Sequence, residues 1–300
     1  MDRSIRVNRR QLCAAGVIAA LPAQALARTA SPAPRTAAAL AALIDPSGSG
    51  SFVAGAPDTV VTGVLVTAAP GIAAIREAIA RRCNLIVSPE SPYYGRPAPA
   101  PTDPASPMAA MTARTVDALA ADVVMIEKHR LIDSNAIAVY RLPDRATPGF
   151  SAVTDALAAQ FGWRRTGDAP IYEAPGTSLR SVLGTAKAKL GADGGLRYIG
   201  DPAMPLRRIV VVPGTTEVVS AITHLRSADA LLTGDLREWE VVEYLFDSRN
   251  AGHPKALIAV GRILSQQPYA ESCAAELRTA APGLRVELLP VRDPFWRIQA

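Results

Sequence analysis

The stretch NLIVSPESPYYG, residues 84–95, places polar and aromatic side chains directly after an apolar strand. The carboxylate of Glu90 and the phenols of Tyr93 and Tyr94 follow that strand within a few residues. Binding and catalytic groups of α/β proteins gather at the carboxyl ends of strands. The stretch is therefore either the rim of an active site or the remains of one.

Histidine, the commonest transition-metal ligand besides cysteine, is scarce in this chain. The three histidines are His129, His224 and His253, and none lies at ligand spacing from a carboxylate. The sequence also lacks CxxC, HExxH, GxSxG, Walker and GxGxxG patterns. These observations argue against a transition-metal site built on histidine, and we expect the three residues at the surface or at helix caps.

Two further carboxylates, Asp144 and Asp235, follow predicted strands. Together with Glu90 they offer the oxygen ligands that Ca²⁺ or Mg²⁺ prefers. The alternative is that these acids cap helices or bond loop amides. Asp235 directly precedes a predicted helix and fits an N-cap position.

Four aromatic residues, Tyr93, Tyr94, Trp239 and Trp296, can stack on a planar ligand in a cleft. The competing interpretation is that they pack between domains or subunits, and the sequence favours this interpretation.

The elements that must position these residues alternate between strand and helix, which predicts an α/β fold. Residues 60–67, 71–82 and 84–87 form a βαβ unit with parallel strands. The other expected helices are 35–44, 108–130, 151–161, 216–226, 237–246 and 269–280, and the other strands are 136–141, 208–212, 230–233, 256–261 and 285–289. We expect loops at 47–57 and, because of its prolines, at 96–107.

Four parts follow from this order of elements. We expect a signal peptide at 1–27, an N-terminal α/β part at 28–150, a middle insert at 151–205 and a C-terminal α/β part at 206–300. The insert would hold a short strand, a helix and another short strand between residues 170 and 200.

Residues 1–27 have the pattern of a secretory signal. A basic start precedes an apolar run at 12–21 that is too short to span a bilayer, and residues 25–27 form an A-x-A cleavage site. The adjacent Arg9 and Arg10 favour a twin-arginine export signal over an ordinary secretion signal. We therefore expect a periplasmic or secreted protein with no membrane anchor.

Charge and cysteine content narrow the function further. Removal of the leader leaves 28 basic and 26 acidic residues, a net charge of +2, which gives no electrostatic case for nucleic acid. Cys83 and Cys273 remain in the mature chain. An oxidising compartment permits a disulfide between them. Their spacing does not decide the pairing, and two separate buried thiols are the favoured state.

Six segments resemble, in order and spacing, the Nif-three-like dinuclear metal centre proteins. They are VAGAPDTVVTGVLVTAAPGIAAIREAIARRCNLIVSPESPYYG (53–95), AIAVYRLPD (136–144), RRIVVVPG (207–214), ADALLTGDLREW (228–239), ALIAVGRILSQQ (256–267) and RDPFW (292–296). The resemblance implies two α/β domains that face each other across a cleft and a homo-oligomer, a toroidal hexamer in the family. It also implies two divalent metal ions, held in the cleft by His, Asp and Glu. Some members are described as GTP cyclohydrolase one type two enzymes.

This chain departs from the family at the metal-ligand positions. The matching positions hold Pro89 and Glu90, Pro143 and Asp144, Thr147, Gly261 and Arg262, and Ser265 and Gln266. Proline has no ligating side chain and arginine stays protonated. Glu90 is therefore the only one of the expected metal ligands that this chain keeps. The resemblance therefore implies a degenerate metal site, and we expect no metal cofactor.

A guanidinium can supply the positive charge that the metals would have given. We expect Arg262 to lie in the former metal space and to pair with Glu90, so that this carboxylate is not buried alone. The alternative is that both side chains point into solvent.

Two functions from different classes fit these residues, and the loss of the metal ligands favours the first. The first is a non-catalytic binding or structural protein that keeps the fold and has an unidentified small-molecule ligand. The second is a hydrolase, metal-dependent or metal-independent, that uses polar groups at the same strand ends: Glu90, Asp144, Arg262 and Gln266.

Overall fold

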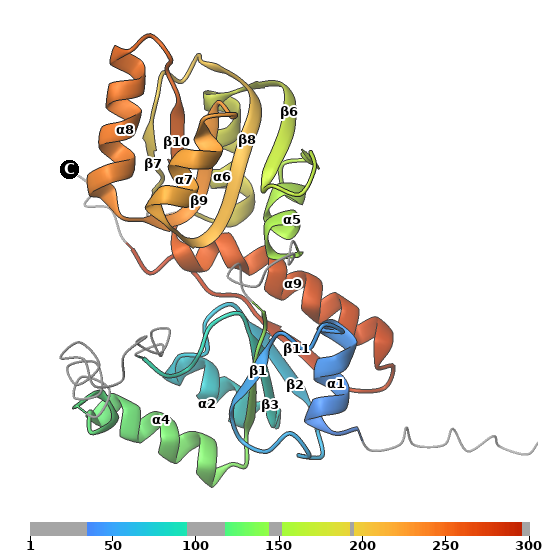
Figure 1. The fold of residues 1–300 in the computed structure, drawn as a ribbon. Helices are drawn as coiled ribbons and strands as arrows, with labels where there is room; N and C mark the ends of the chain where they lie inside the picture. The colour runs from blue at the N-terminus through green and yellow to red at the C-terminus, as the bar shows by residue number, and fades with distance from the viewer. Residues whose placement is uncertain (1–34, 95–117, 144–151, 193–194, 296–300) are drawn as a thin grey trace, which may run out of the picture. The chain divides into compact units, whose positions relative to one another are not determined.

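The computed structural model describes residues 35–94, 118–143, 152–192 and 195–295 (Figure 1). The predicted signal peptide and the proline-rich segment at 96–107 lie outside the described residues, as do Asp144, Thr147 and Trp296. Within the described part, no helix has the length and apolar character needed to cross a membrane.

The first sheet has five strands in the order β1-β4-β3-β2-β11. They are β1 (Ser51–Ala54), β4 (Ala138–Arg141), β3 (Leu85–Ser88), β2 (Val64–Thr67) and β11 (Val286–Leu289). β1 pairs antiparallel with β4, and the other neighbours are parallel. Every residue of β2 and β3 is buried, as expected for central parallel strands covered on both faces.

Helices cover both faces of this sheet. They are α1 (Ala37–Ile44), α2 (Ile72–Ala80), α4 (Val123–Ser134) and α9 (Arg262–Ala280). One face packs on α1 and α9, around Leu40, Val66 and Leu277. The other face packs on α2 and α4, around Ile75, Ile86 and Ile132. The predicted βαβ unit is confirmed as β2, α2 and β3 with parallel strands.

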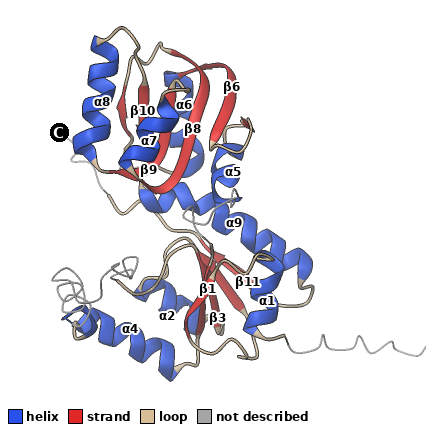
Figure 2. Ribbon diagram, viewed as in Figure 1, coloured by secondary structure: helices blue, strands red, loops and turns tan. Residues whose placement is uncertain are grey.

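The second sheet has six strands in the order β5-β6-β8-β9-β10-β7 (Figure 2). They are β5 (Arg164–Arg165), β6 (Ile171–Ser178), β8 (Pro205–Thr216), β9 (Ala230–Leu236), β10 (Ala256–Ala259) and β7 (Arg197–Ile199). β8, β9 and β10 are parallel to one another. β6 pairs antiparallel with β8, β7 pairs antiparallel with β10, and β5 pairs antiparallel with β6. The expected α/β fold is thus confirmed, with two mixed sheets.

Four helices cover the second sheet. They are α5 (Ala152–Ala159), α6 (Leu179–Leu190), α7 (Val218–Leu225) and α8 (Glu238–Asn250). Leu157 of α5 and Val182 of α6 share one core with Leu232. Leu225 of α7 and Leu245 of α8 share the core on the opposite face with Leu231. Consecutive strand residues thus point into different cores, as the alternation of a strand requires.

Helix α9 differs from its predicted extent. The expected helix is 269–280, which begins directly after Pro268, a residue without an amide proton. The helix instead runs from Arg262 through Pro268 to Ala280. Residues 264–270 are all buried, so tertiary packing outweighs the local cost of the proline.

Two other element predictions are corrected. Residues 51–54, expected within a loop, form β1, because the edge of the first sheet offers β4 as a hydrogen-bonding partner. The strand expected at 230–233 extends to Leu236, because a longer β8 continues beside it, with Thr216 opposite Leu236. The helix that follows begins at Glu238, with Arg237 at the N-cap.

The sheets do not follow the predicted part boundaries at 150 and 205. β11, from the predicted C-terminal part, pairs with β2 of the first sheet. β6 and β7, from the predicted insert, pair with β8 and β10 of the second sheet. The backbone groups of these strands need hydrogen-bonding partners, and the neighbouring strands of each sheet supply them.

Asp45 ties the end of α1 to the first sheet. It is 3% exposed and accepts hydrogen bonds from Ser47 Oγ, the Gly50 amide and Tyr140 Oη, each at 2.6 Å. Burial by itself would raise the pKa of this carboxyl, but the hydrogen bonds from Ser47, Tyr140, Gly50 and Ser49 outweigh it and hold the pKa below its usual value.

Asp45→Asn tests this connection. Because the pKa is lower in the folded chain, the carboxylate stabilises the fold above its unfolded pKa of about 3.9, and this contribution is lost as the pH falls through the folded value. We expect the substitution to reduce the free energy of unfolding by about 1–3 kcal/mol near neutrality, with a smaller difference in acid. Urea unfolding from neutral to acid pH measures the free energy of unfolding, with exposed Asp58→Asn as the control. Equal stability of Asp45→Asn and wild type near neutrality would contradict the prediction.

Candidate functional site

The carboxyl ends of several strands supply the candidate site. β3 ends two residues before Glu90, and β9 ends at Leu236, directly after Asp235. β10 leads through Gly261 into α9. Because α9 begins right after β10, Arg262 and Gln266 stand on its first turns, four residues apart on one face.

Glu90 is the centre of the site. It is 6% exposed, and its two carboxylate oxygens accept from different donors. Oε2 lies 2.8 Å from Arg262 Nη1, and Oε1 accepts from Gln266 Nε2 at 2.8 Å. The predicted Glu90–Arg262 pair is therefore present, and the alternative in which both side chains point into solvent is wrong.

Burial explains why Glu90 has these partners. An ionised carboxylate withdrawn from water costs several kcal/mol unless a charge and hydrogen bonds compensate for the lost hydration. Arg262 provides the charge and Gln266 a second donor. The Arg262 side chain is 44% exposed, so water still reaches part of the guanidinium while the carboxylate side chain is only 8% exposed.

Close packing of backbone fixes the start of α9. The Gly214 amide donates to Ser265 Oγ at 2.9 Å, and Ser265 Oγ donates to the Arg262 carbonyl at 2.7 Å. Gly214 has φ of +71°, and a Cβ there would lie 3.0 Å from Gln266 Nε2. Glycine at this position leaves room for the amide that reaches Glu90.

A buried lysine holds the loop that carries Glu90. Lys128 of α4 is 3% exposed. Its ammonium donates to the Pro92 carbonyl and lies 3.8 Å from the centroid of the Tyr94 ring. A buried ammonium needs such compensation, and the carbonyl and the aromatic face supply it.

Tyr93 and His129 add a second contact between α4 and this loop. Their rings stack with centroids 4.2 Å apart. Burial, followed by the charge of Asp133, raises the pKa of Tyr93 to about 12, so its phenol stays protonated at neutral pH. Both predicted tyrosines therefore pack against α4, and they brace the Glu90 loop.

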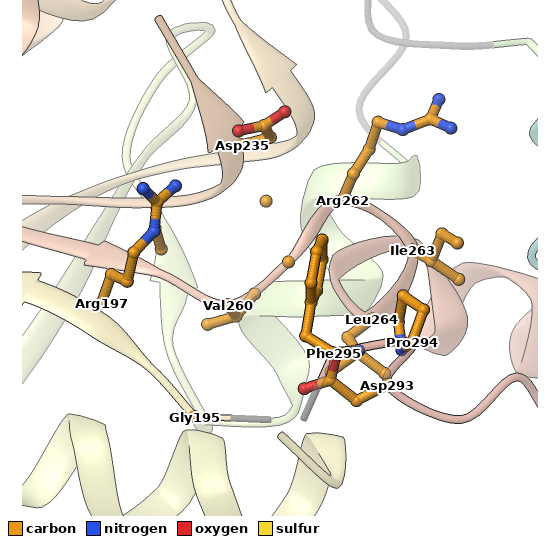
Figure 3. A pocket seen from close by; sticks show the side chains of 13 residues that line it. Gly195, Arg197, Asp235, Val260, Arg262, Ile263, Leu264, Asp293, Pro294 and Phe295 are labelled. Atoms are coloured by element: carbon orange, nitrogen blue, oxygen red, sulfur yellow. The ribbon is translucent and has the colours of Figure 1, made fainter. Parts of the chain in front are cut away.

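A pocket of about 620 Å³ lies beside the start of α9 (Figure 3). Asp235, Arg262 and Phe295 are among the residues that line it, whereas Glu90 and Gln266 are not. In Figure 3, the Arg262 side chain extends away from Phe295. The residue therefore borders the pocket, while its guanidinium forms the ion pair with Glu90. Arg262 thus connects the ion pair and the pocket.

The structure also places Asp235 and Trp239. Asp235 is not a helix N-cap but a residue of β9, and its Oδ1 accepts from the Leu236 amide at 2.8 Å. Trp239 is 59% exposed on α8, and its indole donates to Glu240. The hard-cation site of Glu90, Asp144 and Asp235 stays a prediction, since Asp144 lies outside the described residues.

The donors around Glu90 do not suit the two divalent ions that the family resemblance implies. Both carboxylate oxygens are engaged, and the neighbouring groups are a guanidinium and an amide. Two unit charges of the same sign 4 Å apart repel by about 4 kcal/mol at an effective dielectric of about 20, and a divalent ion doubles this repulsion. In the described ranges, no three His, Cys, Asp or Glu side chains gather as a metal site would require.

Lys128 and Phe295 were not predicted as site residues from the sequence. Lys128 follows Met125 by three positions and precedes Ile132 by four, so helical periodicity places it on the buried face of α4. That signal was available, because a lysine on an apolar face needs a partner. No comparable signal marks Phe295, whose position depends on where the chain runs after β11.

Cys83 and Cys273 are both buried free thiols.

Comparison with protein families gives one match over most of the chain. The profile of the Duf34/NIF3 (NGG1p interacting factor 3) family matches residues 36–293. A comparison with curated proteins gives no match.

Solved structures of low sequence identity share the fold. The hypothetical protein SA1388 from Staphylococcus aureus superposes with a TM-score of 0.62 at 16% identity, over 88% of this chain and 100% of that protein. The protein ybgI, of unknown function, gives 0.64 at 17% identity, over 87% and 100%. A Bacillus cereus protein related to NIF3 gives 0.59 at 13% identity, over 88% and 99%. At these identities the similarity extends to the fold alone.

Gly234→Ala tests the packing behind α9. A Cβ at Gly234 would lie 2.4 Å from both the Gly214 carbonyl oxygen and Ser265 Oγ, so backbone must shift. We expect a loss of about 1–3 kcal/mol in the free energy of unfolding. Gly184→Ala in α6 is the matched control: its Cβ meets no atom within 4 Å, and we expect a gain of about 0.5–1 kcal/mol. Chemical denaturation of both variants measures the difference, and equal effects would refute the packing argument.

Proposed function

Because this chain belongs to the Duf34/NIF3 (NGG1p interacting factor 3) family, we propose that it is a binding protein of that family whose site works without a dinuclear metal centre. One observation carries the proposal. The buried carboxylate of Glu90 is neutralised by Arg262 and hydrogen-bonded by Gln266, both from this chain.

The charge that metals would bring is supplied by a side chain in this site. A guanidinium offers several N–H donors and is not deprotonated in proteins, so it remains a cation at any physiological pH. It also binds through directional hydrogen bonds, with no requirement for open coordination positions. Arg262 therefore satisfies the charge of Glu90 but gives the site no Lewis acid.

The neighbouring pocket supports a binding role. Its volume of about 620 Å³ falls within the range of roughly 300–1,000 Å³ that small-molecule sites occupy. It lies at the carboxyl ends of parallel strands, where open α/β sheets place their ligands. Its wall combines apolar side chains such as Val260 and Ile263 with a few charged ones such as Asp235. Such a lining binds and orients a small molecule.

Metal binding tests the proposal directly. We expect the mature chain, purified without chelator, to hold far less than one transition-metal ion per subunit in elemental analysis. We also expect no stoichiometric heat when Mn²⁺ or Zn²⁺ is titrated into it. Among the described residues, the site offers no uncommitted set of donors, which is the physical reason for both results.

A matched variant makes the titration informative. Arg262→His combined with Gln266→Glu removes the guanidinium and adds two ligating groups beside Glu90. We expect this variant to gain measurable Zn²⁺ binding under conditions in which wild type shows none. Close to two tightly held ions per wild-type chain would contradict the proposal and favour the hydrolase interpretation.

A further inference from the structure

The pocket beside α9 has charges of both signs on its wall. Asp235 and Asp293 are among its acidic residues, and Arg197 and Arg262 among its basic ones. The Arg262 guanidinium is directed to Glu90, which leaves Arg197 as the cation for a ligand. A ligand with only one sign of charge would meet a like charge somewhere on this wall, which disfavours simple anions and simple cations alike.

Asp235 can accept a hydrogen bond from a ligand. Its Oδ1 accepts a hydrogen bond from the Leu236 amide, and the described residues place no donor on its other oxygen. A carboxylate has about four acceptor sites, so one amide leaves capacity for an ammonium group. Asp235 stands at the end of β9 with its carboxylate visible in Figure 3.

Arg197 lies on another part of the same wall, on β7 at the edge of the second sheet. Its Nη1 pairs with Glu238, and the two side chains are 63% and 64% exposed. A guanidinium presents five N–H donors, so this pair leaves others for a ligand carboxylate. Exposed ion pairs are weak, and a ligand can compete for the arginine at little cost.

Phe295 gives the pocket an aromatic face. Its ring is 70% exposed and lies next to Val260 in Figure 3, and Ile263 and Pro294 also line the pocket. An exposed phenylalanine over an apolar wall suits a ligand with an apolar or aromatic body, because that contact removes both surfaces from water.

We propose that this pocket binds a small zwitterion of amino-acid type, in which Asp235 binds the ammonium, Arg197 the carboxylate and Phe295 the apolar body. The inference rests on the proposed binding function but not on the absence of metal. A free amino acid and a short peptide share this chemistry, and the volume of about 620 Å³ admits either.

Calorimetry with defined probes tests the inference on the mature chain. L-Phenylalanine and the dipeptide Ala-Phe are the two zwitterions, and they separate the amino-acid source from the peptide source. Phenethylamine lacks the carboxylate, and 3-phenylpropionate lacks the ammonium. We expect at least one zwitterion to bind with a Kd below about 1 mM and each singly charged probe to bind about tenfold more weakly or worse.

Variants assign the contacts. We expect Asp235→Asn and Arg197→Met each to weaken zwitterion binding about tenfold or more, because each removes a charge-assisted hydrogen bond. Phe295→Ala is expected to weaken it by a smaller factor, about fivefold, from lost apolar contact. The matched controls are exposed residues outside the pocket, Asp168→Asn and Arg180→Met, which should leave the affinity unchanged.

Three results would overturn the inference: no binding of either zwitterion, equal binding of the singly charged probes, or equal affinity in Asp235→Asn, Arg197→Met and wild type. None of these depends on metal content. A chain that held two metal ions and still bound L-phenylalanine through Asp235 would refute the metal-free proposal alone. A metal-free chain that bound neither zwitterion would refute this inference alone.

Discussion

The burial of one carboxylate constrains the whole site. Glu90 sits at the end of a central strand with little access to water, and a charge in that position must be neutralised within the protein. Arg262 and Gln266 do so from the first turns of α9, at 2.8 Å each. The position of α9 relative to β3 is therefore set by a charge requirement as well as by apolar packing.

Contacts around the Glu90 loop and around the start of α9 hold the two partners of the ion pair in place. On one side, Lys128 and His129 of α4 hold the loop of Pro92, Tyr93 and Tyr94, so the backbone that carries Glu90 is anchored. On the other side, Gly214 and Gly234 allow the backbone of β8 and β9 to approach α9 closely. Buried ion pairs stabilise little unless their geometry is accurate, and these contacts supply the accuracy.

Much of the fold was predictable from sequence because its signals are local. The apolar runs of β2 and β3 and the helical periodicity of α2 predict a βαβ unit without tertiary information. The failures are tertiary. β1 forms because β4 offers an edge, α9 continues through Pro268 because its surroundings are buried, and β9 reaches Leu236 because β8 continues beside it.

The ion pair of the site was predictable from sequence, because it follows from the chemistry of a buried carboxylate. Glu90 and Arg262 were paired from the need of a buried carboxylate for a cation, and the structure has that pair. The pocket was not predictable in the same way. Arg197, Asp235 and Phe295 lie on separate elements, and only the folded chain brings them to one wall. The N-cap position considered for Asp235 was wrong because the predicted strand ended at residue 233, three residues before the end of β9.

The central claim is that Arg262 is the counter-ion of Glu90, and a double-mutant cycle measures it most directly. Stability is determined by chemical denaturation for Glu90→Gln, Arg262→Met and the double variant, with the exposed pair Glu77 and Arg81 as the reference cycle. We expect a coupling energy of about 1 kcal/mol or more for Glu90 and Arg262, against about 0.3–0.5 kcal/mol for the exposed pair. Additive effects of the Glu90 and Arg262 substitutions would contradict it, because the two side chains would then stabilise the fold independently.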